Sequence, residues 1–458
     1  MLRSVLLVIG VLALAAGVAA GGFAVTRSVH HHKDNPAGPA PTASALVMAT
    51  APPTPAASAS PGAPAVPAAV AKALSGLVDA SALGGRLRAE VVDALTGAQL
   101  YASSPMVAAA PASTAKLLTA TAVLNARGAD YRMTTQALTD DSGTLFVKGA
   151  GDPTLSAAKS GSAPRYPGAG RLSDLVSQLA AAHVSVARIV VDDSAFTGAA
   201  VSPKWAAGDV PSDFASGITA FMADGGRANP AASIRSAEPD LDAGRELAAL
   251  LGVPGAPVTR GTVPAGARSV ASVRSATMGQ LVEQMLGASD NVIAECLARQ
   301  VAMAAHADAS FTGAAGAVRA ALTKLGADPG AGLVDGSGLA ASDRTTPAAL
   351  AAVLRVIASS DHPELHGIVT ALPVAAWSGT LADRYLPGSG SKGAGSVRAK
   401  TGTLTGVATL AGYVHDASGR LLVFALMADQ VPAGDAATAA ADAALDRIAA
   451  QLATCGCR

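Results

Sequence analysis

Ser113 and Lys116 stand three positions apart in a Ser-Thr-Ala-Lys sequence, at the start of an apolar stretch. A serine hydroxyl needs an adjacent base to become a nucleophile. On a helix, residues i and i+3 share one face, a single turn apart. A lysine amine can serve as that base only if burial or a nearby cation lowers its pKa. The pair therefore indicates nucleophilic catalysis at Ser113.

The same Ser-x-x-Lys spacing also begins at Ser156 and at Ser389. Those two copies lie among Gly, Ser and Pro residues, where no helix would hold the pair together. Only Ser113 follows a proline and opens an apolar helix, expected at Lys116–Asn125. Backbone N–H groups at a helix start also suit a developing negative charge. These features favour a functional role for Ser113 over an ordinary serine near a helix start.

Ser289-Asp290-Asn291 falls in a short break between two expected helices, Met278–Leu286 and Val292–Ala304. A hydroxyl there can relay a proton, and a carboxamide can both donate to and accept from a substrate amide. Taken alone, the cluster is more simply explained as an N-cap of the second helix, because Ser, Asp and Asn all cap well.

Lys400-Thr401-Gly402 lies within Ser396–Thr405, which is expected to be a strand. A cation and a hydroxyl on a strand edge can hold a substrate carboxylate, and the glycine lets an extended ligand approach the backbone. This tripeptide, too, would be unremarkable alone.

In this order and in these settings, the three motifs resemble the S-x-x-K, S-x-N and K-T-G set of penicillin-recognising serine enzymes. The distance from Ser113 to Ser289 is longer than a compact β-lactamase would be expected to need. It resembles the low-molecular-mass class C penicillin-binding proteins, the D-alanyl-D-alanine carboxypeptidase/endopeptidases, which carry an extra domain between the first two motifs. Four further stretches look like that family: Gly149–Leu155, Val191–Phe196, Asp335–Leu339 and Leu372–Val374.

The resemblance implies roles for eight residues: the catalytic Ser113, Lys116 and Ser289, and the substrate-binding Asn291, Lys400, Thr401, Gly402 and Thr403. In the implied reaction the lysine of the first motif takes the serine proton, and the serine attacks the carbonyl of the penultimate D-alanine. The backbone N–H groups of Ser113 and Thr403 would form the oxyanion hole. Ser289 would pass a proton to the departing amine. Asn291 would hold the peptide amide.

The resemblance also implies the ligands. Lys400 with Thr401 would bind the terminal carboxylate of peptidoglycan peptides that end in D-Ala-D-Ala. A β-lactam would be trapped as a covalent inhibitor, and no cofactor or metal is expected. The chain departs from the family pattern in the segment Asp213–Ala223, where Phe214 replaces a usual tyrosine.

The elements that must position these motifs suggest an α+β fold. Strands are expected near the start of the folded part, at Leu87–Val92, and near its end, at Thr409–Val414 and Leu421–Met427. Helices lie between them, so one antiparallel sheet would be assembled from remote segments and flanked by helices. With the resemblance, this predicts a β-lactamase/transpeptidase-like catalytic domain (residues 70–134 and 266–458) and a smaller inserted α/β subdomain (residues 135–265).

Residues 1–29 are expected to be a signal peptide or a membrane anchor. Ser4–Val25 carries no charge and is long enough to cross a bilayer, which takes about 20 residues. It could equally be a cleaved secretory signal. Residues 30–69 are expected to form a disordered Pro/Ala-rich linker, since Pro36–Pro67 holds nine prolines and no charged residue. Either way, the bulk of the chain would be extracytoplasmic, anchored to the membrane or secreted.

The composition bounds the partners. The chain has 33 basic and 33 acidic residues among 458, so it lacks the one-signed field that favours nucleic acid. Among its three cysteines, Cys296 is expected to be an inert core thiol. Cys455 and Cys457 are separated by one glycine, where a disulfide would be strained. A frayed C-terminal tail is therefore the preferred interpretation there.

Three other functions compete. A class A β-lactamase deacylates with a glutamate on a loop that carries an asparagine four positions later, and no asparagine follows Asn291. A non-catalytic β-lactam sensor or a wall-binding scaffold on the same fold stays possible. A metal hydrolase is suggested only by His362-Pro363-Glu364-Leu365-His366, which fits neither H-E-x-x-H nor H-x-x-E-H.

Overall fold

The computed structural model describes residues 64–140, 142–386 and 391–458. The expected anchor at residues 1–29 and most of the expected linker, residues 30–63, therefore lie outside the described residues. Within the described part of the chain, no helix is both long enough and apolar enough to span a bilayer.

The first sheet has five strands in the order β2-β1-β10-β9-β8 and is antiparallel throughout. Its strands come from both ends of the described chain: β1 (Leu87–Asp93), β2 (Gln99–Ser103), β8 (Arg398–Leu404), β9 (Val407–His415) and β10 (Leu421–Ala428). The predicted antiparallel sheet of remote segments is thus present. The β9–β10 hairpin is closed by Asp416, whose carboxylate accepts from the N–H groups of Ser418 and Arg420.

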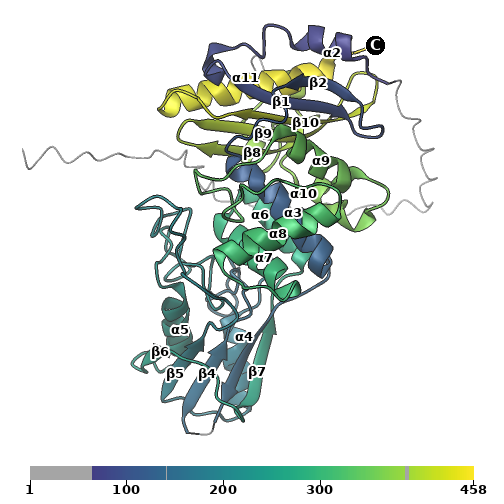
Figure 1. The fold of residues 1–458 in the computed structure, drawn as a ribbon. Helices are drawn as coiled ribbons and strands as arrows, with labels where there is room; N and C mark the ends of the chain where they lie inside the picture. The colour runs from purple at the N-terminus through teal and green to yellow at the C-terminus, as the bar shows by residue number, and fades with distance from the viewer. Residues whose placement is uncertain (1–63, 141, 387–390) are drawn as a thin grey trace, which may run out of the picture. The chain divides into compact units, whose positions relative to one another are not determined.

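Helices cover both faces of this sheet (Figure 1). Side chains alternate along a strand, and those of β10 divide accordingly. Val423, Ala425 and Met427 pack into the core that holds α3 (Lys116–Arg127), α6 (Met278–Ala288), α7 (Asn291–Ala304), α8 (Phe311–Lys324) and α9 (Pro347–Ala358). Leu422, Phe424 and Leu426 pack against α2 (Pro67–Leu74) and α11 (Asp435–Thr454). The Ser113–Lys116 and Ser289–Asn291 motifs belong to the first of these layers, and Lys400–Gly402 lies on β8.

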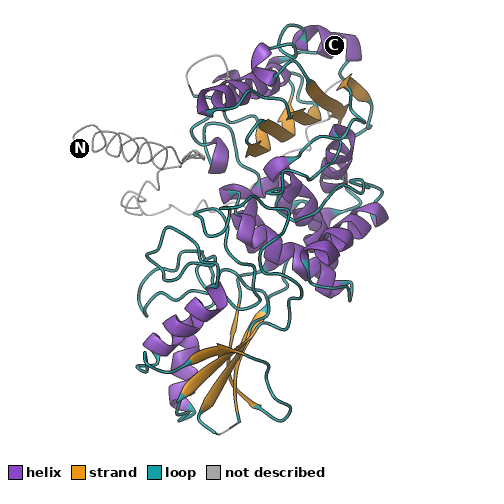
Figure 2. Ribbon diagram, turned by 60° about the vertical axis from the view of Figure 1, so that its left-hand side comes forward, coloured by secondary structure: helices purple, strands orange, loops and turns teal. Residues whose placement is uncertain are grey.

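A second sheet, of order β6-β5-β4-β3-β7, belongs to the inserted part (Figure 2). It is formed by β3 (Thr134–Thr139), β4 (Thr144–Lys148), β5 (Arg188–Asp192), β6 (Val258–Arg260) and β7 (Arg268–Arg274), with α4 (Leu172–Ala181) and α5 (Pro239–Leu250) packed on it. The β4–β5 and β5–β6 pairs are parallel. Because β7 pairs with β3, this sheet continues to Arg274, past the expected boundary at residue 265. We define the inserted subdomain as residues 134–274.

Two expectations about the chain ends need correction. Helix α2 begins at Pro67, inside the expected linker, and its Val70 and Leu74 are fully buried. The C-terminal residues are not a frayed tail: Cys455 and Cys457 form a disulfide, and both are buried in the same core cluster as α2. The Val66 N–H donates to the Cys457 carbonyl at 2.7 Å. The start of the described chain and its C-terminus therefore pack in one core cluster. Neither segment shows this contact in its own sequence.

The segment His362–His366, considered above as a metal-binding motif, forms a turn, as expected. Pro363–Leu365 is a single 3₁₀ turn followed by the short helix α10 (Gly367–Ala371). His362 Nδ1 lies 3.1 Å from Glu364 Oε1, and His366 Nε2 lies 2.9 Å from the Ser359 carbonyl. Among the described residues, no three His, Cys, Asp or Glu side chains converge as metal ligands.

Candidate active site

Ser113 lies on a 3₁₀ turn, Ala112–Ala115, that leads directly into α3 at Lys116. Ser113 was expected to open the α-helix; instead it lies on a tighter 3₁₀ turn, and the α-helix begins at Lys116. In a 3₁₀ turn, residues i and i+3 nearly eclipse each other, so the two side chains are brought into line. Lys116 Nζ lies 2.9 Å from Ser113 Oγ.

Lys116 is fully buried, and its amine meets two further acceptors. Nζ donates to Asn291 Oδ1 at 2.6 Å and to the Ser337 carbonyl at 2.9 Å. Burial lowers the pKa of Lys116 to about 8, against the opposing pull of the nearby Asp335, Glu295 and Asp290 carboxylates. About a fifth of the amine is therefore neutral near pH 7.4, far more than for an ordinary lysine.

The Ser289–Asn291 motif occupies the break between α6 and α7. Ser289 has a left-handed backbone, with φ of 56°, and this ends α6. Asp290 caps α7, because its Oδ1 accepts from the N–H groups of Val292 and Ile293. The capping explanation is thus correct for Asp290, and it leaves the two flanking side chains available. Asn291 Nδ2 donates to the Phe214 carbonyl at 3.2 Å.

Lys400 lies on β8, the edge strand of the first sheet. Its Nζ donates to Ser289 Oγ at 2.9 Å and to the Thr401 carbonyl at 2.8 Å. The side chain is fully buried, and burial together with the positive charges of Lys116 and Arg384 holds its pKa well below the usual value. Thr401 Oγ1 donates to Thr380 Oγ1 at 2.9 Å.

Gly402 places β8 against the Ala112–Ala115 turn that carries Ser113. A Cβ built at this position would lie 3.0 Å from Ser113 N and 2.8 Å from the Pro111 carbonyl. Thr409 Oγ1, on β9, donates to the same Pro111 carbonyl. The Ala399 N–H bonds Pro373 on the outer side of β8, and successive backbone groups of a strand alternate in direction. The Thr403 N–H therefore also points away from β9, while its side chain is exposed.

These contacts join residues from three remote segments. Lys116 is hydrogen-bonded to both Ser113 and Asn291. Lys400 is hydrogen-bonded to both Ser289 and Thr401. Gly402 lies next to Ser113. A model of the D-Ala-D-Ala carboxypeptidase 3 (S13) family matches residues 70–233 and 228–452. The chain belongs to this carboxypeptidase family.

Relatives and solved structures agree with this membership. Carboxypeptidase Rv3627c of Mycobacterium tuberculosis is 42% identical over 381 residues, 81% of each chain. Carboxypeptidase DacB of Mycolicibacterium smegmatis is 42% identical over 383 residues, again 81% of each. Penicillin binding protein 4 from Haemophilus influenzae has the same fold, with a TM-score of 0.68 at 22% identity over 82% of this chain and 98% of that one.

The predicted family and activity are confirmed: the protein is a serine-type D-Ala-D-Ala carboxypeptidase of the penicillin-recognising group. This activity is favoured over the β-lactamase, the sensor and the scaffold considered from the sequence. The second Ser-x-x-Lys copy lies in a loop of the inserted subdomain, where Ser156 Oγ accepts from the Ala158 N–H. The third copy begins at Ser389, outside the described residues.

Sequence reasoning missed the buried acids behind the carboxypeptidase site. Glu295, on α7, accepts from the N–H groups of Gly336 and Ser337, and Asp335 accepts from the Gly338 N–H. These bonds hold the loop whose Ser337 carbonyl meets Lys116. Burial raises the pKa of Glu295 to about 7. Glu295 and Arg299 are a charged pair at i and i+4 inside an apolar helix. This pattern in the sequence could have predicted a group of buried charged side chains.

A Gly402→Ala substitution is expected to destabilise the carboxypeptidase. The added methyl would lie 2.2 Å from Thr409 Oγ1 and would press on the Ser113 turn, and overpacking costs about 1–3 kcal/mol. Thermal unfolding would show a lower Tm. Gly316→Ala is the matched control, because this α8 glycine has open space around it and alanine favours a helix. An unchanged Tm for Gly402→Ala would contradict the close approach.

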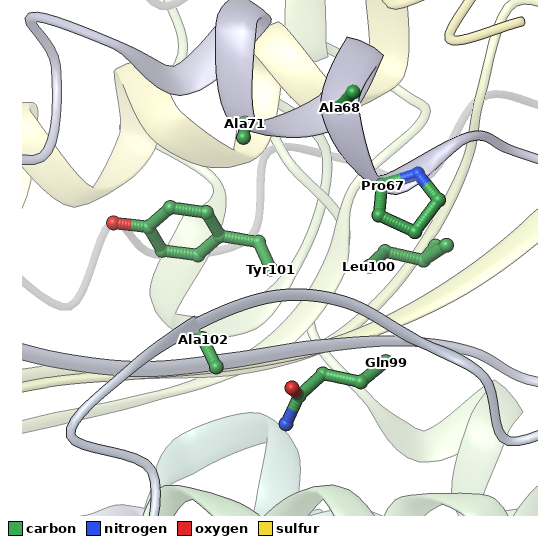
Figure 3. Close-up of a pocket in the computed structure, with 7 residues that line it drawn as sticks. All are labelled: Pro67, Ala68, Ala71, Gln99, Leu100, Tyr101 and Ala102. Carbon is green, nitrogen blue, oxygen red and sulfur yellow. The ribbon is translucent and has the colours of Figure 1, made fainter.

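A cavity of about 430 Å³ lies elsewhere on the carboxypeptidase, between α2 and β2 (Figure 3). Pro67, Ala68 and Ala71 line one side, and the strand residues Gln99, Leu100, Tyr101 and Ala102 line the other. Because β2 and β8 are opposite edges of the first sheet, this cavity is not part of the catalytic site.

Proposed function

We propose that the carboxypeptidase removes the terminal D-alanine of peptidoglycan stem peptides through an acyl-enzyme formed on Ser113. The observation that carries this proposal is the 2.9 Å contact between Ser113 Oγ and the fully buried amine of Lys116. A serine beside a base of lowered pKa is the arrangement that nucleophilic catalysis needs. The family membership supplies the substrate class.

The contacts of Lys116 fit a neutral amine acting as the base. A neutral amine has two N–H bonds, which satisfy Asn291 Oδ1 and the Ser337 carbonyl. The remaining lone pair then faces the Ser113 hydroxyl and accepts its proton. Ser113 Oγ attacks the carbonyl carbon of the penultimate D-alanine, and the negative charge collects on the carbonyl oxygen.

That oxygen would be held by the backbone N–H groups of Ser113 and Thr403. Gly402 brings these two segments together, as the close approach to Ser113 N indicates. One oxyanion-hole donor is typically worth about 3 kcal/mol of barrier. Ser289, held by Lys400, would pass a proton to the departing D-alanine amine, and Asn291 would orient the substrate amide.

For the terminal carboxylate, Thr401 is the better direct partner. Lys400 is fully buried, and its amine is already engaged by Ser289 and the Thr401 carbonyl. We therefore propose that Lys400 acts on the carboxylate indirectly, through its hydrogen bond to Ser289. The Thr401 hydroxyl would make the direct contact, in place of its bond to Thr380.

A β-lactam would acylate the same serine and remain attached. Incubation of the wild-type protein with benzylpenicillin should add one penicilloyl mass to the intact protein. Digestion with trypsin should locate this mass on the Ala89–Lys116 peptide. Release of D-alanine from a pentapeptide ending in D-Ala-D-Ala should be measurable in parallel. An adduct on another peptide, or no D-alanine, would refute the proposal.

The rate of acylation should depend on pH through Lys116. Only the neutral amine can accept the serine proton, so kcat/KM is expected to rise about tenfold per pH unit below the pKa of about 8 and to level off above it. Stopped-flow acylation by a chromogenic cephalosporin between pH 5.5 and 9.5 would give the midpoint. A profile that is flat across pH 7–9 would exclude Lys116 as the base.

We further propose that the enzyme works outside the cytoplasm. Ser4–Val25 would anchor it, and the proline-rich segment that follows would hold the catalytic part away from the membrane. The uncharged length of the first segment and the proline content of the second support this arrangement.

A further inference from the structure

We propose that Tyr166 and Arg235 of the inserted subdomain are positioning residues for acyl transfer, because they hold Asp290 and thereby aim Ser289 and Asn291 at the substrate. This inference rests on the proposed function. It gives the inserted subdomain a part in the reaction, although it contributes none of the eight predicted site residues.

Both carboxylate oxygens of Asp290 accept hydrogen bonds. Its Oδ1 caps α7, and its Oδ2 accepts from Arg235 Nη2 at 2.8 Å and from the Tyr166 hydroxyl at 2.9 Å. The Arg235 and Asp290 side chains are only 6% and 5% exposed. A buried ion pair of this kind cannot exchange its partners for water, so it fixes the carboxylate strongly. Ser289 and Asn291 flank that carboxylate directly in the chain.

The same guanidinium also holds the segment that contacts Asn291. Arg235 Nε donates to the Asp213 carbonyl at 3.0 Å, and Nη1 donates to the Gly225 carbonyl at 2.8 Å. The next carbonyl after Asp213, that of Phe214, accepts from Asn291 Nδ2. The Asn291 carboxamide is thus fixed at its nitrogen by the inserted subdomain and at its oxygen by Lys116. A main-chain carbonyl makes this contact, so the Phe214 side chain is not required for it.

Position and charge act together on the base. The charged groups around Lys116 are Asp335, Glu295, Asp290 and Arg235, and Lys400 lies close enough for the two lysines to influence each other. Arg235 disfavours the ammonium form, so its removal should raise the pKa of Lys116. Asp290 favours the ammonium form and is itself ionised above about pH 2, so its removal should lower that pKa. The two substitutions should move the pH profile in opposite directions.

The test compares benzylpenicillin acylation rates and pH profiles of wild type, Tyr166→Phe, Arg235→Met, Asp290→Asn and the Arg235→Met/Asp290→Asn double variant. Tyr166→Phe removes only the hydroxyl and should slow acylation about tenfold with little change in Tm, because small misplacements of reacting groups are costly. Arg235→Met should raise the midpoint pH, and Asp290→Asn should lower it. The double variant should lose less than the product of the two single losses, as expected for residues that act through each other.

The control is Arg260→Met, which breaks another ion pair of the inserted subdomain: Arg260 bonds Glu238 and the buried Asp240 and has no bond to Asp290. It should keep the wild-type acylation rate and midpoint. Failure of the wild type to acylate would refute the proposed function itself. Wild-type acylation with unchanged rates and midpoints in the Tyr166 and Arg235 variants would overturn the positioning role. So would losses that merely follow Tm and appear equally in Arg260→Met.

Discussion

Ser113→Ala is expected to abolish both D-alanine release and the penicilloyl adduct, with a fall in turnover of about 10⁴-fold or more. Without the hydroxyl no acyl-enzyme can form, and what remains is the binding and oxyanion stabilisation that leave a small residual rate in other serine hydrolases. Intact-mass spectrometry after exposure to benzylpenicillin would show the unmodified mass alone. D-alanine release would be followed over hours with a coupled assay.

The control is Ser156→Ala. This serine begins a second Ser-x-x-Lys sequence, but it lies in a loop and its Oγ accepts from the Ala158 N–H. The variant should keep the adduct and the activity. A penicilloyl adduct on Ser113→Ala, or its loss from Ser156→Ala, would show that the nucleophile was assigned wrongly.

Lys116→Met and Lys116→Arg are both expected to lower the acylation rate by about 10³-fold. General-base catalysis contributes about 10²- to 10⁴-fold, and methionine removes the amine while keeping most of the side-chain length. Arginine keeps a positive charge but cannot lose its proton near neutral pH. The pair of variants therefore separates a proton acceptor from a mere cation. The measurement is the second-order acylation rate constant at pH 8.

Thermal unfolding of both lysine variants would be recorded beside the kinetics. Because Asn291 Oδ1 and the Ser337 carbonyl lose a donor in the methionine variant, some loss of stability is expected there. If Lys116→Arg retained activity within tenfold of wild type, the amine would act through its charge, and the proposed base would be wrong.

The three motifs of the proposed site could be recognised in the sequence because each is local. Ser113 and Lys116 are one turn apart, Ser289 and Asn291 flank a single helix cap, and Lys400 to Gly402 lie on one strand. Their convergence followed only from the resemblance to known enzymes. The strands expected at Thr409–Val414 and Leu421–Met427 were also recognisable, and they are present as β9 and β10.

The missed features depend on contacts between remote segments. Residues 268–274 were assigned to the catalytic domain, but they form β7, which pairs with β3 of the inserted subdomain. Cys457 is buried in the same core as α2, whose first three residues alone were assigned to the linker. The ion pair between Arg235 and Asp290 joins residues of different subdomains. A sequence read segment by segment does not reveal such pairs.

The pairing of Leu87 with Ala428 has a consequence for biosynthesis. Ser113, the proposed nucleophile, is made early in translation, whereas β8, β9 and β10 are among the last segments to be made. Long-range strand pairing is slow because the entropy of closing a large loop is lost before any stabilising contact forms. A nascent or truncated polypeptide that lacks these strands also lacks Lys400 and the edge strand beside Ser113, so we expect it to be inactive until the whole sheet has formed.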